Sequence, residues 1–115
     1  MPVRIEFDKP RTLHFDIESL SDLEAAMGGK PLLSILSDIL RLGVTAITAS
    51  LWAGLKHEDK GLNQKLVGRM LGTYLKNGGK MRPLANALDE ALGETGLFDR
   101  EDTEGNAQPE PATVS

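Results

Sequence analysis

The sequence contains no cysteine, few aromatic residues and no long uncharged segment. The absence of cysteine excludes disulfides and thiolate metal sites, which fits a reducing compartment. The longest uncharged stretch, Leu42 to Leu55, is too short to cross a bilayer and is rich in Thr, Ser and Gly. The opening residues, Met-Pro-Val-Arg-Ile-Glu, lack the basic-then-apolar order of a signal peptide. We therefore expect a soluble, cytoplasmic protein without a membrane partner.

Residue patterns that indicate catalysis or cofactor binding are also lacking. The two histidines, His14 and His57, are not at zinc-ligand spacing, and the segment 57–59 is typical of a solvated loop. Gly-Gly-Lys occurs at 28–30 and at 78–80, but the Ser or Thr of a phosphate-binding loop follows neither copy. No serine lies in a nucleophile-elbow motif, and no carboxylate pair can be assigned an acid–base role. We therefore predict no enzymatic activity, no cofactor and no metal ion.

Charge is small in sum but unevenly placed. The whole chain carries a net charge of −4, and residues 99–115, with five acids and one base, carry a net of −4. Residues 1–98 therefore balance, but the segment Lys56–Arg82 holds seven bases and two acids, a net of +5. This segment has three interpretations, in order of preference: a solvated face, a contact for an acidic helix of a protein partner, and a nucleic-acid surface. Because the protein is acidic and poor in aromatics, we expect no nucleic-acid partner.

Apolar periodicity predicts a mainly α (α+β) fold, with an N-terminal β-hairpin over 2–16 packed on about five short helices. Caps and apolar spacing predict helices over 17–27, after Pro31, over Val44–Leu55, over 63–76 and after Pro83. Sequence alone leaves open whether the two helices around Gly43 are one kinked helix. We predict a single domain at 1–98. Residues 99–115 form a predicted disordered acidic tail, because their composition offers too little apolar surface to bury.

The segment Val44–Leu55 contains the only tryptophan and no charged residue. Its large apolar residues share one helical face and its small residues share another, so we expect it at the centre of the fold. Gly68 and Gly72 stand one turn apart in a later helix, which predicts close backbone packing against the central helix. Trp52 is interpreted first as a core anchor and second as a partly exposed anchor for a partner.

Several segments occur together in the order and spacing of a known family. They are Arg4-Ile5-Glu6-Phe7-Asp8, Arg11-Thr12-Leu13-His14-Phe15-Asp16-Ile17, Asp22-Leu23-Glu24, Met27-Gly28, Leu51-Trp52-Ala53-Gly54-Leu55-Lys56-His57-Glu58-Asp59 and Val67-Gly68. Across residues 3–98 the chain resembles the small tail assembly chaperones, also labelled tail tube proteins, of gene transfer agents and long-tailed bacteriophages. The resemblance implies a non-enzymatic assembly factor of the bacterial cytoplasm. Such a factor coats the helical tape-measure protein and helps tail tube subunits polymerise around it, and it is absent from or minor in the finished particle.

With this resemblance, the residues suggest where a partner binds. We hypothesise that an amphipathic partner helix lies in a groove near Leu51, Trp52 and Leu55, with its acids meeting Lys65 and Arg69. Two other functions stay open. One is a structural tube or completion component that remains in the tail, and the other is a small DNA-binding regulator that uses the basic segment. Self-association also stays open.

Overall fold

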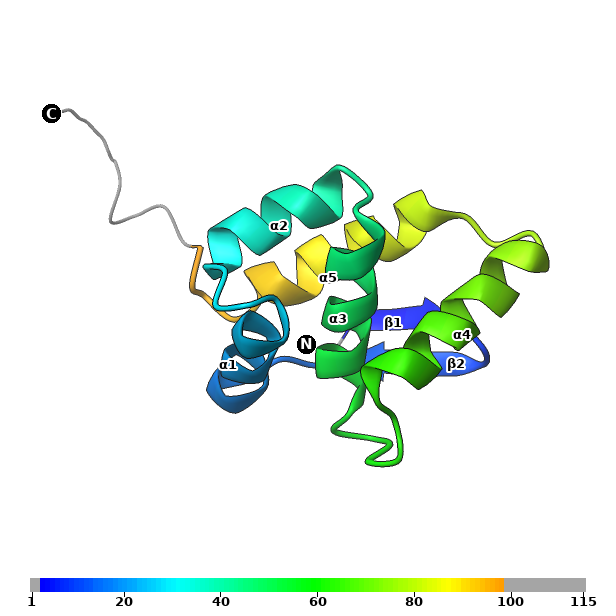
Figure 1. The fold of residues 1–115 in the computed structure, drawn as a ribbon, viewed down its shortest axis with the longest axis horizontal. Coiled ribbons are helices and arrows are strands. Elements are labelled where there is room, and N and C mark those ends of the chain that lie inside the picture. The colour runs from blue at the N-terminus through cyan, green and yellow to red at the C-terminus, as the bar shows by residue number, and fades with distance from the viewer. Residues whose placement is uncertain (1–2, 99–115) are drawn as a thin grey trace, which may run out of the picture.

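A two-stranded hairpin and five helices make up residues 3–98, the part of the chain that the computed structural model describes (Figure 1). The elements are β1 (Val3–Glu6), β2 (Pro10–Leu13), α1 (Ile17–Ala26), α2 (Leu32–Leu40), α3 (Val44–Leu55), α4 (Gln64–Lys76) and α5 (Met81–Gly93). The predicted mainly α fold with an N-terminal hairpin is confirmed. The predicted tail at 99–115 lies outside the described residues.

Helix α3 occupies the centre of this arrangement, as predicted. It contacts β2 and each of the other four helices of the described chain, and Figure 1 shows it between α1, α4 and α5. Eight of its 12 residues are buried, on both the large-residue face and the small-residue face. A helix without charge that is apolar on all sides is stable only when neighbours cover it on all sides. The absence of charge from this segment thus explains its place in the fold.

The hairpin lies across α3 and α5 with its apolar side chains turned inward. Val3, Ile5 and Leu13 are buried, and the alternating residues of β1 are exposed. Beyond β2, the His14 N–H donates to the carbonyl oxygen of Gly54 at 3.0 Å, which ties the strand to the end of α3. The chain approaches so closely here that a Cβ atom on Gly54 would lie 2.9 Å from the ring of Phe15. Gly54 is therefore the position where α3 requires the absence of a side chain.

Helix boundaries mostly follow the predicted caps. Asp16 caps α1 through Ser19, and Asn63 caps α4 by accepting the Leu66 N–H at 2.8 Å. The largest shift of a helix start is at α5, which begins at Met81 and includes Pro83 in its first turn. Proline is tolerated there because the first N–H groups of a helix have no partner inside the helix.

Helices α2 and α3 are two separate helices. The chain bends by 117° between them, and Leu42 adopts a positive φ of 65° at the break. No single helix among the described residues is long and apolar enough to span a membrane, and only this bent pair meets that test jointly.

The predicted close packing at the α4 glycines is wrong for Gly72. A Cβ atom there would have no neighbour within 4 Å, because this part of α4 faces solvent. A Cβ atom on Gly68 would lie 3.8 Å from Thr48 Cγ2 of α3, which is an ordinary contact distance. Helices α3 and α4 do pack together, but without an approach that demands glycine.

Candidate functional site

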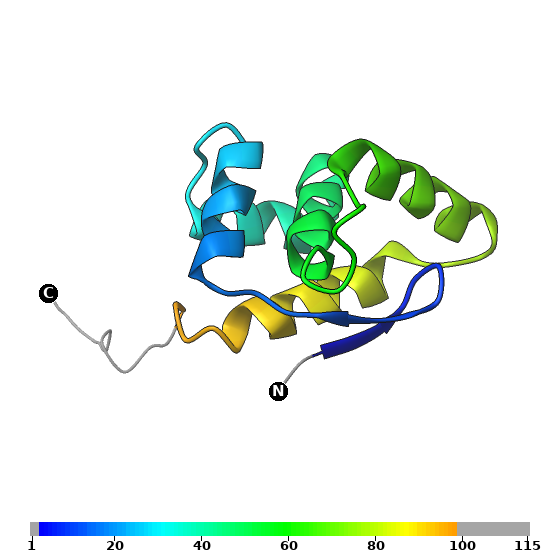
Figure 2. The same ribbon diagram turned by 90° about the horizontal axis from the view of Figure 1, so that it is seen from below.

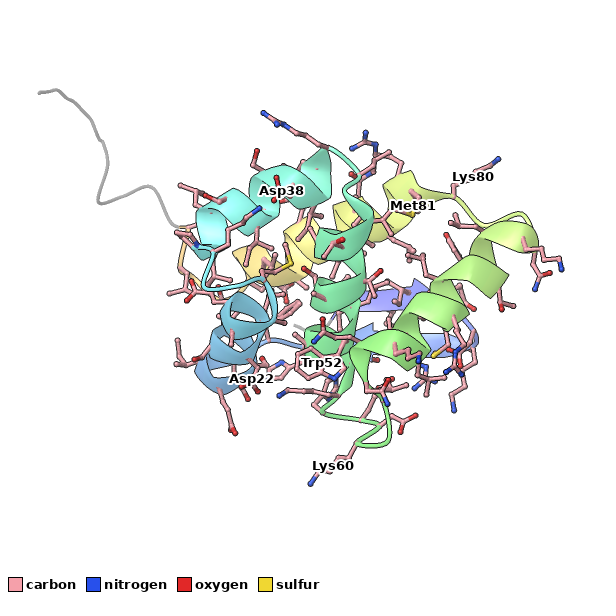
Figure 3. The ribbon with its side chains drawn as sticks, viewed as in Figure 1. Asp22, Asp38, Trp52, Lys60, Lys80 and Met81 are labelled. Carbon is pink, nitrogen blue, oxygen red and sulfur yellow. The ribbon has the colours of Figure 1, made fainter. Side chains whose placement is uncertain are left out.

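Trp52 lines a pocket of about 430 Å³ that is bounded by α3, the start of α1 and the linker after α3. One part of the indole packs on the core, yet the residue is only half-buried, whereas its neighbours in the pocket, Ala53 and Leu62, are buried. Trp52 and Asp22 extend from α3 and α1 toward one another, and Lys60 points outward from the linker (Figure 3). Trp52 therefore both anchors the core and offers apolar surface in an open pocket.

Two lysines, Lys56 and Lys60, line the pocket together with the indole. Lys56 Nζ lies 4.9 Å from the centroid of the Trp52 ring and forms an ion pair with Asp22. Lys60 also lines the pocket, is exposed and makes no ion pair with another described residue. The pocket thus joins an aromatic surface to one cation held in place, Lys56, and to a second, Lys60, that no described acid pairs with.

The acidic residues of the pocket are arranged differently. Asp16 accepts the Ser19 N–H at 2.8 Å, and this hydrogen bond, followed by the one from the Ser19 hydroxyl, lowers the pKa of the Asp16 carboxyl. Asp16 is therefore held in its charged form as the cap of α1. Glu18 follows in the first turn of α1, where a negative charge favours the helix dipole. Both acids contribute to the start of α1.

The two histidines, which lie far apart in the sequence, meet at one edge of the pocket. Their ring centroids are 5.5 Å apart in an edge-to-face arrangement. Nε2 of His57 lies 2.8 Å from the carbonyl oxygen of Thr12, and because a carbonyl only accepts, Nε2 carries the proton in this bond. No group of three or more His, Asp or Glu side chains in residues 3–98 is placed to hold a metal ion.

The five predicted partner-binding residues do not form one groove. Leu51 and Leu55 are 0% exposed, so the prediction that they line a surface groove is wrong. Both belong to the hydrophobic core, on a part of α3 that neighbouring elements cover. Lys65 and Arg69 are exposed on α4, but neither lines the Trp52 pocket. Of the five, only Trp52 belongs to that pocket.

Arg69 belongs instead to a second groove, of about 620 Å³, between α4 and the hairpin turn. Phe7 and Tyr74 form its aromatic part, with ring centroids 5.7 Å apart. The Tyr74 hydroxyl donates to the carbonyl of Lys80 at 2.7 Å and accepts the Lys80 N–H at 3.1 Å. Tyr74 thereby fixes the loop between α4 and α5, so its hydroxyl has a structural role.

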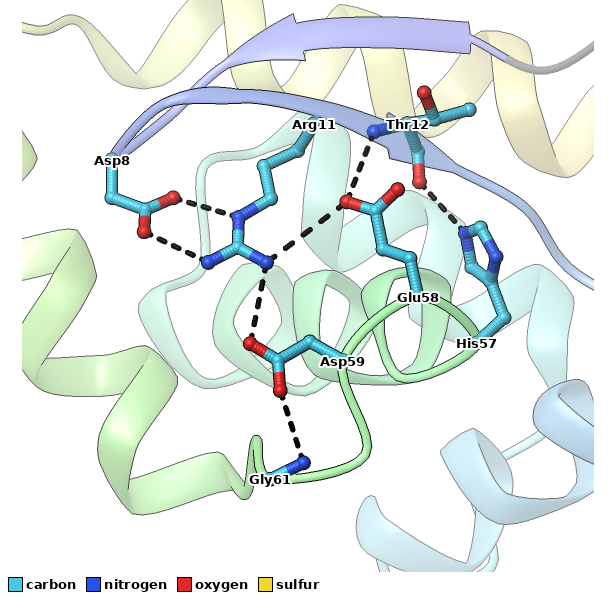
Figure 4. Close-up of polar contacts among 7 residues, drawn as sticks. All are labelled: Asp8, Arg11, Thr12, His57, Glu58, Asp59 and Gly61. Atoms are coloured by element: carbon cyan, nitrogen blue, oxygen red, sulfur yellow. Dashed lines mark hydrogen bonds and ion pairs between the residues drawn. The ribbon is translucent and has the colours of Figure 1, made fainter.

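The buried Arg11 was missed by the sequence analysis, and it gives the segment 57–59 a structural role (Figure 4). Its guanidinium donates two hydrogen bonds of 2.8 Å to Asp8 and one of 3.5 Å to Asp59. The hydrogen bond from Arg11 is the main cause that lowers the pKa of Asp8. His57 and Glu58 are exposed, as expected of a solvated loop, but the side chains of 57–59 also bind the hairpin, which the sequence did not predict.

Comparison of the chain with models of known protein families, with curated proteins and with solved structures finds no match. Fold and site therefore define the class of protein directly: a small helical protein with a hairpin and a tryptophan-lined surface pocket.

Proposed function

We propose that the protein is a non-enzymatic tail assembly chaperone of a bacteriophage or gene transfer agent, which binds the tape-measure protein and assists assembly of the tail tube. The observation that carries the proposal is the half-buried Trp52 in its open pocket. Tryptophan is enriched at binding hot spots because its large rigid surface is desolvated at small entropic cost. The resemblance across residues 3–98 supports the choice of partner.

The chemistry of the pocket supports a helical, acidic ligand. A leucine or methionine of an amphipathic helix would bury itself against the indole, as in other helix-in-groove complexes. A carboxylate one turn away on that helix would meet Lys60, which has no intramolecular ion pair among the described residues. Lys65 and Arg69 lie outside the pocket, and they would steer an acidic partner by their charge without touching the docked segment.

Occupied side chains support a binding function over catalysis. His57 lines the Trp52 pocket and Glu58 follows it in the chain, and both side chains bind backbone groups of Thr12. General acid–base catalysis requires a side chain that is within hydrogen-bond reach of a substrate proton. Side chains that already hold a strand in place are poorly suited to that work.

The test uses the single tryptophan as its own reporter. Titrating the full chain with a tape-measure protein from the same phage or gene transfer agent should change the emission of Trp52, because binding removes the indole from water. Trp52→Ala should abolish co-purification of the tape-measure protein, and Lys60→Glu should weaken it. Leu75→Ala is the matched control, since Leu75 is an apolar residue of α4 that is 40% exposed and lines neither pocket.

A folded Trp52→Ala variant that still co-purifies the tape-measure protein would contradict the proposed site. Circular dichroism of each variant establishes that it is folded. Mass spectrometry of purified particles separates the alternatives, because a chaperone is scarce there and a retained structural component is present in stoichiometric amounts. A salt-dependent mobility shift with DNA would instead favour the regulator.

A further inference from the structure

The two outer edges of the hairpin differ in how their backbone groups are satisfied. Thr12, in the middle of β2, donates its N–H to Oε1 of Glu58 at 3.4 Å and accepts from Nε2 of His57 at 2.8 Å (Figure 4). These two side chains occupy the donor and the acceptor that a further strand would use. The outer edge of β2 is therefore closed by side chains of the same molecule.

The outer edge of β1 has no such cover. Arg4 lies opposite Thr12, and the backbone groups of Thr12 point away from β1, so this is a non-hydrogen-bonded pair of the ladder. The N–H and C=O of Arg4 therefore point outward from β1, and those of Glu6, two residues further on, do the same. No other described residue bonds these groups. In Figure 2, β1 begins at the lower margin of the molecule, beside the N-terminus.

The side chains of this edge carry opposite charges and have no ion-pair partners within residues 3–98. Arg4 and Glu6 are exposed, and neither makes an ion pair with another described residue. Their neighbours across the hairpin are Thr12 and Pro10, which are uncharged. Natural edge strands often use charge to prevent pairing, but an alternation of sign lets a strand complement itself.

We propose that β1 pairs with β1 of a second copy, antiparallel about a two-fold axis at Ile5, to form a four-stranded sheet across a dimer. In this register Arg4 faces Glu6 of the second copy, and Glu6 faces its Arg4. Both residues point their backbone groups outward, so each facing pair exchanges two hydrogen bonds. Ile5 then faces Ile5 on the buried side, and the apolar inner face continues through the dimer.

Charge selects this register over its neighbours. A shift by one residue would place outward-pointing groups opposite inward-pointing ones, so only shifts by two keep the ladder. One such shift sets Arg4 against Arg4, and the opposite shift sets Glu6 against Glu6 and Arg4 against Asp8, which already binds Arg11. Like charges directly opposite each other destabilise a sheet. The proposed register is the one with two pairs of opposite charge.

The experiment measures association of the full chain by sedimentation equilibrium. The wild type should show a monomer–dimer equilibrium, and Arg4→Glu and Glu6→Arg should each weaken self-association by roughly tenfold or more. An equal mixture of these two variants should form a heterodimer, because the two acidic side chains on one strand edge then face the two basic side chains on the other, in two pairs of opposite charge. The doubly swapped chain, Arg4→Glu with Glu6→Arg, should associate like the wild type. Lys76→Glu, which reverses an exposed charge on α4, is the matched control and should leave association unchanged.

Amide exchange locates the interface. Exchange of the Arg4 and Glu6 amides should slow as the protein concentration rises, while exchange of the Thr12 amide should not depend on concentration. The proposal is overturned by a wild type that stays monomeric at all soluble concentrations. It is equally overturned by a dimer that both single variants retain, or by a mixture that fails to associate. The interface is separate from the Trp52 pocket, so these outcomes do not depend on the tape-measure protein.

Discussion

Replacing Gly54 by alanine tests how closely the hairpin approaches α3. In an open helix interior the change would stabilise the protein by about 1 kcal/mol, because alanine loses less backbone freedom. At Gly54, however, the added Cβ would lie 2.9 Å from Phe15 Cζ and 3.0 Å from Leu13 Cδ2. Both neighbours are buried, at 6% and 1% exposure, so neither moves away freely. Overpacking of a core costs about 1–3 kcal/mol, so we expect a net loss of about 1–2 kcal/mol.

Gly72→Ala is the matched control, since it makes the same chemical change in α4 where no atom lies within 4 Å of the added Cβ. Here the propensity gain is unopposed, and we expect a stabilisation of about 0.5–1 kcal/mol. Urea unfolding followed by circular dichroism measures both, and the slope with urea should stay constant. The double variant Gly54→Ala with Phe15→Leu should recover part of the loss, because it removes the nearest ring atom. If the two glycine variants changed stability by the same amount and in the same direction, the close approach at Gly54 would be refuted.

Two further predictions concern polar groups. Ser50 is 0% exposed and its hydroxyl has no hydrogen-bond partner among the described residues, so Ser50→Ala should leave the free energy of unfolding unchanged or raise it by about 1 kcal/mol. Asp8 has a lowered pKa because of Arg11, so the ion pair stabilises the fold above the ordinary value of 3.8 and loses its effect as pH falls through the folded-state pKa. Arg11→Met should return the pKa of Asp8 toward 3.8 in an NMR titration. The free energy of unfolding should then depend less on pH in the acid range. The pKa of Asp16, which is lowered through Ser19, should stay as it is and serves as the internal control.

Local signals in the sequence were enough to predict the elements of the fold. Asp16 and Asn63 caps, the glycine after α1 and the alternation in β1 each act within a few residues, so the chain specifies them without tertiary context. The break at Gly43 was left open because a glycine permits both a kink and a turn. The structure shows two helices separated by a turn in which Leu42 adopts a positive φ. A positive φ is uncommon for leucine, so the sequence could not predict it.

Contacts between distant residues account for what could not be predicted. Periodicity placed Leu51 and Leu55 on one face of α3, but it did not show that the hairpin and four helices would bury that face. Glycine content suggested close packing, yet it did not distinguish Gly54, against the hairpin, from the exposed Gly72. A helical pattern describes which residues share a face, whereas burial depends on what the rest of the chain places against that face.

The segment 51–59, the central part of the family resemblance, is explained chiefly by its contacts with the hairpin. Its buried residues and Gly54 pack against the hairpin, and Lys56 forms an ion pair with Asp22 of α1. His57 to Asp59 bind Thr12 and Arg11. These roles require the residue types found there, since any protein that docked such a hairpin in this way would need a small residue at the contact and polar groups at the strand edge. Trp52 is the residue of this segment whose size the fold does not demand, because part of the indole stands in an open pocket. Within this segment Trp52 is therefore the residue that points to a binding function, and substitution of that side chain is the decisive experiment.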